Sequence, residues 1–128
     1  MNESEIQQII QMEAVKFGVT LMRNNSGALK DSTGRVVRFG LGNVSKVHSD
    51  KIKSSDLIGF KTVTITPEMV GQRIAVFTAI ECKHPDWNPD KKLDQRELAQ
   101  LNFIQWVLAK GGIAGFANDV SSMERILK

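Results

Sequence analysis

The residues best suited to chemistry stand at the end of an apolar run. Residues 73–83 read Arg-Ile-Ala-Val-Phe-Thr-Ala-Ile-Glu-Cys-Lys, and this β-branched and aromatic composition predicts a buried strand, the longest of the chain. Because side chains on a strand alternate between two faces, we expect Glu81 and Lys83 on one face and Cys82 on the other. The carboxylate and the ammonium form either an ordinary surface ion pair or part of a reactive site.

A second carboxylate favours the reactive site. Asp56 lies in the strand-like segment Ser55-Asp56-Leu57-Ile58-Gly59-Phe60, upstream of Glu81. Carboxylates at the ends of adjacent strands can share a Mg²⁺ ion, which takes one or two carboxylates together with waters and phosphate oxygens. Lys83 beside them can hold an attacking water or offset the charge that develops on a phosphate. The pattern Asp, then Glu-x-Lys, therefore indicates phosphodiesterase chemistry.

Composition predicts one soluble domain. The 128 residues are 41% hydrophobic and 24% charged, which fits a single globular domain over residues 1–128 with one core. No signal-peptide pattern and no apolar segment of membrane-spanning length occurs in the sequence, so a cytoplasmic protein without membrane contact is expected. The single cysteine excludes an intramolecular disulfide and a Cys-type zinc site, and we interpret Cys82 as a small core residue.

The positive charge is concentrated in one segment. The net charge of the chain is +3, whereas residues 23–53 alone carry seven basic and two acidic residues, a net charge of +5. A basic segment that precedes a carboxylate cluster suits a polyanion whose phosphates must approach a metal site. The alternative, a solvated loop with many lysines, is equally compatible with the charges alone.

The first helix carries a third candidate carboxylate. Asn2 and Glu5 form a capping-box pattern, and apolar residues recur at helical spacing until Gly18. Glu13 falls on that apolar stripe, where an unpaired carboxylate is costly. It is either the partner of a lysine or arginine, or a further metal-site carboxylate.

The remaining segments alternate strands, loops and helices. Strands are expected at 19–22, 36–39, 56–60, 62–66 and 113–117, and a mobile or substrate-facing connection at 44–54. Asp94 and Glu97 form a capping pattern for a helix that ends at Gly111-Gly112 and carries Gln100, while Ser121 and Glu124 are expected to cap a terminal helix. Trp87, in a proline-containing linker, either stacks on a base or folds onto its own domain.

Five short motifs in this order resemble the PD-(D/E)xK nuclease superfamily, and more narrowly the stand-alone VRR-NUC (virus-type replication-repair nuclease) domains of phages and bacteria. The matching residues span nearly the whole chain, although Ser55 stands where the superfamily has proline. They are Glu13, Arg23-Asn24-Asn25-Ser26-Gly27, Ser55-Asp56-Leu57-Ile58-Gly59, Ile80-Glu81-Cys82-Lys83, and Gln100 with Gly111-Gly112.

The resemblance implies an α/β (α+β) restriction-endonuclease-like core, with a small mixed central sheet flanked by helices in the order αβββαβ. It implies that Asp56, Glu81 and the Cys82 backbone carbonyl bind Mg²⁺ or Mn²⁺, with Glu13 completing the acidic cluster. Lys83 would activate the attacking water, and Gln100 would assist. No small-molecule organic cofactor is expected. The residues that we expect to contact DNA are Arg23, Asn25, Ser26, Arg38, Lys46, Lys51 and Lys53.

The activity implied is structure-selective endonucleolytic cleavage of DNA, at branched substrates such as Holliday junctions, by a homodimer with two sites related by a two-fold axis. Two alternatives remain open at this point. One is a flap-type or restriction-type nuclease on the same fold, and the other is a non-catalytic DNA-binding module. The module predicts that alanine at Asp56, Glu81 and Lys83 is tolerated, whereas a nuclease loses turnover and keeps DNA binding.

Overall fold

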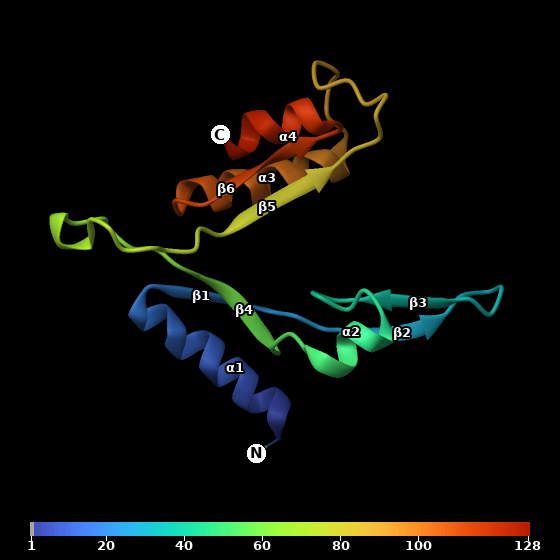
Figure 1. Cartoon of the computed structure of the whole chain (residues 1–128), viewed down its shortest axis with the longest axis horizontal. Coiled ribbons are helices and arrows are strands. Elements are labelled where there is room, and N and C mark those ends of the chain that lie inside the picture. Colours follow the sequence, from blue (N-terminus) through green and yellow to red (C-terminus); the bar gives the residue numbers. More distant parts are fainter. Residues whose placement is uncertain (1) are drawn as a thin grey trace. The chain divides into compact units, whose positions relative to one another are not determined.

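The chain forms a mixed α+β fold of small sheets and helices, arranged in two structural units (Figure 1). The computed structural model describes residues 2–128. Unit 1 ends at Lys61 and unit 2 begins at Thr62. Each unit has its own paired strands and its own helices, so the local positions of the candidate residues follow from the unit that carries them.

Unit 1 contains two antiparallel strand pairs. Its elements are α1 (Glu3–Ala14), the 3₁₀ turn η1 (Val15–Phe17), β1 (Val19–Arg23), β2 (Gly27–Lys30), β3 (Val36–Phe39), α2 (Lys46–Lys51) and β4 (Leu57–Lys61). Strand β1 pairs with β4 from Val19↔Lys61 to Arg23↔Leu57. Strands β2 and β3 form a hairpin. Asp31 shapes its turn by accepting a hydrogen bond from the Thr33 backbone N–H at 2.9 Å.

Local sequence signals fix the ends of α1. The Asn2 side chain accepts a hydrogen bond from the Glu5 backbone N–H, and the Glu5 carboxylate accepts one from the Asn2 N–H, both at 2.9 Å. This reciprocal pair satisfies two amide groups that the first helical turn leaves without partners. Gly18 then adopts a positive φ of 72°, which ends the helical segment and lets the chain enter β1.

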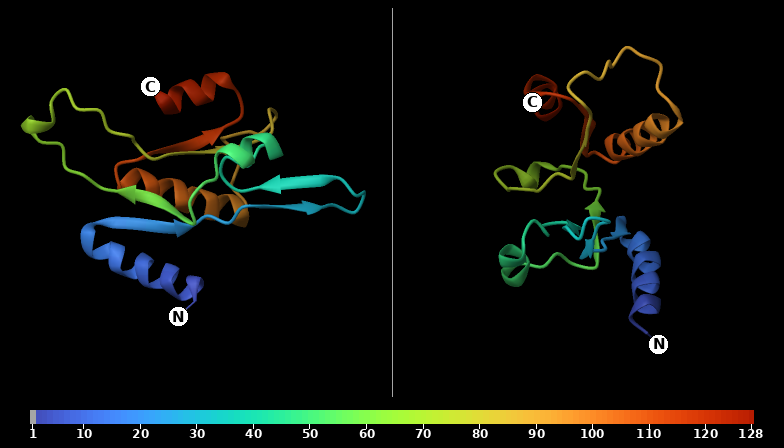
Figure 2. Two further views of the ribbon diagram at one scale, coloured as in Figure 1. Left: turned by 60° about the horizontal axis from the view of Figure 1, so that its bottom comes forward. Right: turned by 90° about the vertical axis from the view of Figure 1, so that its right-hand side faces the viewer.

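Unit 2 is a parallel strand pair with a helix on each face. Its elements are the 3₁₀ turn η2 (Pro67–Met69), β5 (Thr78–Cys82), α3 (Gln95–Ala109), β6 (Ile113–Ala117) and α4 (Val120–Leu127). Strands β5 and β6 pair from Thr78↔Ile113 to Cys82↔Ala117, and α3 is the crossover that parallel strands require. Helices α3 and α4 lie on opposite sides of the two strands (Figure 2).

The buried core of unit 2 lies between α3 and the strands. Ile104, Val107 and Ala114 are its buried members, and Val107 is only 1% exposed. Phe77, Ala79, Trp106 and Phe116 pack around them. Because Ala79 belongs to this cluster, the side-chain alternation of β5 places Glu81 and Lys83 on the face that α3 covers. The core therefore sets the orientation of the Glu-x-Lys pair.

The expected long buried strand over 73–83 is wrong in length and burial. Only Thr78–Cys82 are in β5, and residues 73–76 are exposed and outside any strand. Strand β6 begins at Ile113, whose N–H bonds to the Phe77 carbonyl at 2.9 Å. No strand of unit 2 pairs with residues 73–76. An apolar, β-branched run forms a strand only where another strand accepts its hydrogen bonds.

Four other local expectations are also corrected. Residues 62–66 form no strand. Residues 44–54 are not a simple connection, because Ser45 caps α2 by accepting a hydrogen bond from the His48 N–H at 3.1 Å. Five strands lie between α1 and α3, rather than the three of the order αβββαβ. Cys82 is exposed and is not a core residue, since it lies on the face of β5 opposite to the core.

The N-cap of α4 is Asp119 and not Ser121. The Asp119 carboxylate accepts hydrogen bonds from the Ser122 N–H and the Ser122 hydroxyl, both at 2.7 Å. These bonds, with a smaller contribution from Arg125, hold the pKa of Asp119 below its ordinary value near 3.8. A carboxylate whose pKa is lowered by folding stabilises the folded state above its unfolded pKa, and this contribution is lost as the pH falls through the folded pKa.

We therefore expect Asp119→Ala to lower the melting temperature at neutral pH. Asp119→Asn keeps an oxygen acceptor, so its melting temperature should stay close to that of the wild-type protein. Thermal unfolding followed by circular dichroism between about pH 7 and pH 2.5 tests the charge contribution. Below about pH 4, the wild-type protein should lose more of its melting temperature than Asp119→Asn. Equal losses in the two proteins would contradict this assignment.

The coarse fold class is confirmed, since helices and small sheets are mixed along the chain. One central sheet with PD-(D/E)xK connectivity stays a prediction, as does a single domain over 1–128. Within residues 2–128, no helix is both long enough and apolar enough to cross a membrane.

Candidate functional site

Glu81 and Lys83 project from the carboxyl end of β5 toward α3. Glu81 is the fourth residue of this strand, and Lys83 directly follows its last residue. The Lys83 backbone N–H still bonds to the Ala117 carbonyl at 2.8 Å, so the strand geometry extends through Lys83. The expected placement of both side chains on one face is confirmed, because both contact the same residue of α3.

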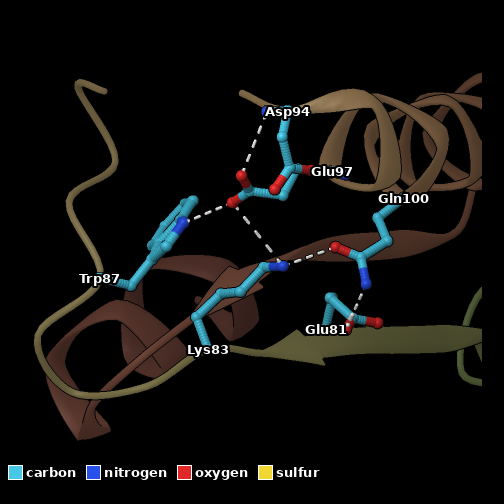
Figure 3. A network of polar contacts seen from close by, with 6 residues as sticks. All are labelled: Glu81, Lys83, Trp87, Asp94, Glu97 and Gln100. Carbon is cyan, nitrogen blue, oxygen red and sulfur yellow. Dashed lines mark hydrogen bonds and ion pairs between the residues drawn. The ribbon is translucent and has the colours of Figure 1, made fainter. Parts of the chain in front are cut away.

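That residue is Gln100, which joins the carboxylate to the ammonium (Figure 3). Lys83 Nζ donates to Gln100 Oε1 at 2.6 Å, and Gln100 Nε2 donates to Glu81 Oε1 at 2.9 Å. An ammonium only donates and a carboxylate only accepts, so the two neighbours fix the orientation of the amide. Gln100 was predicted to assist at this site, and it lies beside Lys83, while its part in a reaction stays a prediction.

Lys83 is enclosed on several sides. Its side chain is 14% exposed, and its Nζ lies 3.8 Å from Glu97 Oε2. The same nitrogen is 5.3 Å from the centroid of the Phe116 ring and 6.0 Å from that of Trp87, distances at which aromatic faces attract a cation. One hydrogen bond, one carboxylate and two rings thus restrict the position of the ammonium group.

Glu97 is held as firmly as the lysine that it faces. Its Oε2 accepts a hydrogen bond from Trp87 Nε1 at 2.6 Å, and its Oε1 accepts one from the Asp94 N–H at 3.2 Å. In return, the Glu97 N–H donates to the Asp94 carboxylate, and this bond is the main reason why the pKa of Asp94 lies below its ordinary value. The capping box that begins α3 therefore also fixes the carboxylate beside Lys83.

Trp87 folds onto its own unit, one of the two alternatives predicted for it. Its ring lies 5.2 Å from the Phe116 ring, centroid to centroid. The Asn118 side-chain amide donates to the carbonyls of Trp87 and Pro85 at 3.1 and 3.2 Å. The segment between β5 and α3 is thereby tied to the end of β6.

The ligand set around Glu81 fits a hard cation that keeps most of its waters. Glu81 Oε1 accepts from Gln100, and no donor within residues 2–128 bonds to its second oxygen, which leaves that oxygen for a metal. In the described part of the chain, no three His, Cys, Asp or Glu side chains are grouped so that they could hold a metal ion. Side chains of the described residues therefore do not form a complete coordination shell at this site. Mg²⁺ needs only one or two carboxylates, because waters fill its other positions.

The Cys82 carbonyl points away from β6. Phe77 and Lys83 form backbone hydrogen bonds with β6, and in a strand alternate residues direct their backbone groups to the same edge. The carbonyls of Thr78, Ile80 and Cys82 therefore point to the edge of β5 away from β6. Metal binding by Glu81 and the Cys82 carbonyl stays a prediction.

A cavity of about 500 Å³ opens beside this network. Glu81 and Gln100 line it together with Arg96, which comes from the first turn of α3. Three apolar side chains of the same unit, Ile80, Phe103 and Ile104, form other parts of its wall. Glu81 and Arg96 therefore line the same cavity.

Asp56 and Glu13 are carried by unit 1, and their relation to Glu81 stays a prediction. Asp56 directly precedes β4, and its carbonyl accepts a hydrogen bond from the Asn24 N–H at 2.9 Å. Its side chain is exposed. Glu13 is not buried on an apolar stripe, because its side chain is 55% exposed and pairs with Lys16 Nζ at 2.6 Å. A lysine partner was one of the two alternatives for Glu13.

Part of the predicted DNA-contacting set gathers in unit 1. Ser26, Arg38 and Lys53 line one cavity of about 220 Å³, and Arg38 donates to Asn43 Oδ1 at 3.3 Å. Arg23 donates instead to the Ser4 hydroxyl at 2.8 Å, and Asn25 lies in the loop between β1 and β2. Lys46 and Lys51 are exposed at the two ends of α2.

Sequence reasoning missed the second role of Glu97. Glu97 stands one helical turn before Gln100, so the two side chains share a face of α3. Once Gln100 was expected near Lys83, this spacing was the signal that could have placed Glu97 there too. The capping pattern alone accounts for a glutamate at position 97, so it does not indicate the contact between Glu97 and Lys83.

No family model, no curated protein and no solved structure matches this chain. The case for a function therefore depends on the residues and contacts described above.

Proposed function

We propose that the chain is a metal-dependent endonuclease that hydrolyses DNA phosphodiester bonds, and that branched DNA such as Holliday junctions is its preferred substrate. The observation that carries this proposal is the chain of contacts from Glu81 through Gln100 to Lys83. It joins a carboxylate with one unbonded oxygen to an ammonium whose position is restricted. A simple surface ion pair would need neither the amide bridge nor the enclosing rings.

The charge and the position of each site residue suggest its role. Glu81 and the Cys82 carbonyl would hold Mg²⁺ or Mn²⁺, and the roles of Asp56 and Glu13 as further ligands stay predictions. A bound divalent ion polarises the phosphate and lowers the pKa of a bound water. Lys83 would orient the attacking water or offset charge on the phosphate, and the Gln100 amide would keep Lys83 and Glu81 at a fixed separation.

The charge distribution supports a polyanionic substrate. Arg96 borders the cavity beside Glu81, where a guanidinium group can bind a phosphate oxygen of the DNA backbone. In unit 1, Arg38 and Lys53 line a cavity of their own, and exposed lysines flank α2. Such contacts position DNA without reading its sequence, as a structure-selective enzyme requires.

We further propose that the active form is a homodimer. A single copy offers one Glu81–Lys83 pair, and symmetric incision of a four-way junction needs two such sites. Localisation in the cytoplasm of a bacterium or phage-infected cell, where DNA is the accessible substrate, belongs to the same proposal.

The test is to incubate the purified protein with labelled four-way junction, flap and plain duplex DNA, in Mg²⁺, in Mn²⁺ and in EDTA. We expect cleavage that requires either metal and is fastest on the junction, with symmetric nicks. Preferred cleavage of the flap or the duplex would change the substrate assignment and keep the chemistry. DNA binding with no cleavage in either metal would favour the non-catalytic module, and a salt titration of that binding would measure its phosphate contacts.

A further inference from the structure

The geometry points to Glu97 and Trp87 as positioning residues for Lys83, an inference that rests on the proposed nuclease function. Lys83, Glu97 and Trp87 form a closed set of contacts: ammonium to carboxylate at 3.8 Å, carboxylate to indole N–H at 2.6 Å, and ammonium to indole ring at 6.0 Å (Figure 3). Neither Glu97 nor Trp87 belongs to the motifs that suggested the activity.

A fixed position for the Lys83 ammonium group requires two restraints. The hydrogen bond to Gln100 fixes the distance from Nζ to one atom and leaves the ammonium free to swing around it. Glu97 provides a second, charged anchor on another side of the ammonium. Two anchors from one face of α3 hold the group far more narrowly than either anchor alone.

Both charged side chains of this pair are largely buried. The side chains of Lys83 and Glu97 are 14% and 16% exposed, so neither charge is well solvated. A charge withdrawn from water is costly unless an opposite charge or hydrogen bonds compensate it. Glu97 compensates Lys83, while Trp87 and the Asp94 N–H compensate Glu97. Each member of the set is thus required by its neighbour.

Trp87 couples this set of contacts to the segment between β5 and α3. Its ring packs on Phe116, its carbonyl accepts a hydrogen bond from Asn118, and its indole N–H donates one to the Glu97 carboxylate. The segment therefore sets the position of the Glu97 carboxylate, and through it the position of Lys83. Displacement of Trp87 would loosen Lys83 although the strand that carries Lys83 stays in place.

The principal test is Glu97→Gln. The single glutamine oxygen can still accept from the Trp87 N–H, and the Asp94 carboxylate still accepts from the N–H of residue 97. The charge facing Lys83 is lost, together with the 3.2 Å bond from the Asp94 N–H, because the amide nitrogen that replaces the second oxygen cannot accept. We expect kcat for DNA cleavage to fall about 10–100-fold, as for other groups that act by orienting a reactive residue, while KM stays within about twofold. Glu124→Gln is the matched control, because it makes the same change in an exposed glutamate of unit 2.

A second pair of variants separates positioning from packing. Trp87→Phe keeps an aromatic ring beside Phe116 and removes the indole N–H, so kcat should fall with KM unchanged. Trp106→Phe makes the same change in the other tryptophan and should leave kcat near the wild-type value. The indole ¹H–¹⁵N NMR signal of Trp87, assigned by its loss in Trp87→Phe, should shift in Glu97→Gln and remain in place in Glu124→Gln. This signal reports the contact without any need for activity.

The outcomes are distinct. If the wild-type protein cleaves DNA and Glu97→Gln retains full kcat, the positioning role is overturned and the proposed function stands. An unchanged Trp87 indole signal in Glu97→Gln would likewise overturn it. If the wild-type protein cleaves none of the substrates, the proposed function fails and this inference fails with it.

Discussion

Replacing Glu81 by glutamine should abolish metal-dependent DNA cleavage and leave the fold intact. The glutamine oxygen still accepts the hydrogen bond from Gln100, so the bridge to Lys83 persists. What is lost is the negative charge that would draw a divalent ion to the end of β5. Since a bound metal supplies several kcal/mol of charge stabilisation, we expect the cleavage rate to fall about 10³-fold or more.

Three measurements on the same protein check this expectation. Single-turnover cleavage of a labelled junction gives the rate, a binding assay without metal gives the affinity for DNA, and thermal unfolding reports the fold. Affinity should be equal to or higher than that of the wild-type protein, because one charge that repels phosphate is removed. Glu124→Gln, which changes an exposed glutamate of the same unit, should cleave at the wild-type rate.

An unchanged cleavage rate in Glu81→Gln would remove the residue on which the proposal depends. A parallel loss of cleavage, binding and thermal stability would instead mark Glu81 as a structural residue. Only loss of rate with binding and stability retained supports a metal-binding carboxylate.

The parts of the fold that sequence predicted are those that local signals determine. The capping boxes at Asn2 and Asp94 set where α1 and α3 begin, and Gly18 and Gly111, both with positive φ, end the helical segments. Each signal acts within a few residues and needs no partner elsewhere. The alternation that puts Glu81 and Lys83 on one face is local in the same sense.

The misassigned parts depend on distant partners. Residues 73–77 have strand-forming composition, yet β6 offers only five positions for pairing. Residues 62–66 likewise lack a partner strand in unit 2. Cys82 was expected in the core because it lies on the face of β5 opposite to Glu81 and Lys83, but helix α3 covers the face of those two residues and Cys82 is exposed.

In the candidate site, too, local patterns could be predicted and contacts with distant residues could not. The neighbourhood of Gln100 and Lys83 could be predicted because a motif linked them, whereas the Trp87–Glu97 bond joins an irregular segment to a helix and no periodic pattern reports it. Glu13 shows the limit of a periodic pattern. A position on the apolar stripe of α1 predicted burial, but Glu13 extends into solvent and pairs with Lys16 one turn away.

A second large effect is expected from Gly59→Ala in unit 1. A Cβ atom at this position would overlap the Thr20 carbonyl oxygen and lie 3.0 Å from the Leu21 Cα. Both are backbone atoms of the paired strand β1, so no side-chain rotation can relieve the overlap, and β1 and β4 must separate. We expect a loss of about 3 kcal/mol in the free energy of unfolding, the upper end of the range for overpacking.

Gly115→Ala in unit 2 is the comparison. A Cβ there would lie 2.9 Å from two atoms of the Ile126 side chain, which has rotational freedom, so a smaller loss is expected. Denaturant unfolding of the two variants measures the difference. Equal stability of Gly59→Ala and the wild-type protein would show that β1 and β4 do not approach as closely as described.

Gly59→Ala also tests the predicted role of Asp56. Asp56 immediately precedes β4, and its carbonyl is bonded to Asn24, which follows β1, so separation of these strands displaces Asp56. Glu81, Gln100 and Lys83 belong to unit 2, where the Trp87 indole signal reports their surroundings. If Asp56 contributes to the metal site, Gly59→Ala loses cleavage while that signal stays in place. Full cleavage in a variant whose β1–β4 pairing is lost would leave Glu81 as the carboxylate on which the reaction depends.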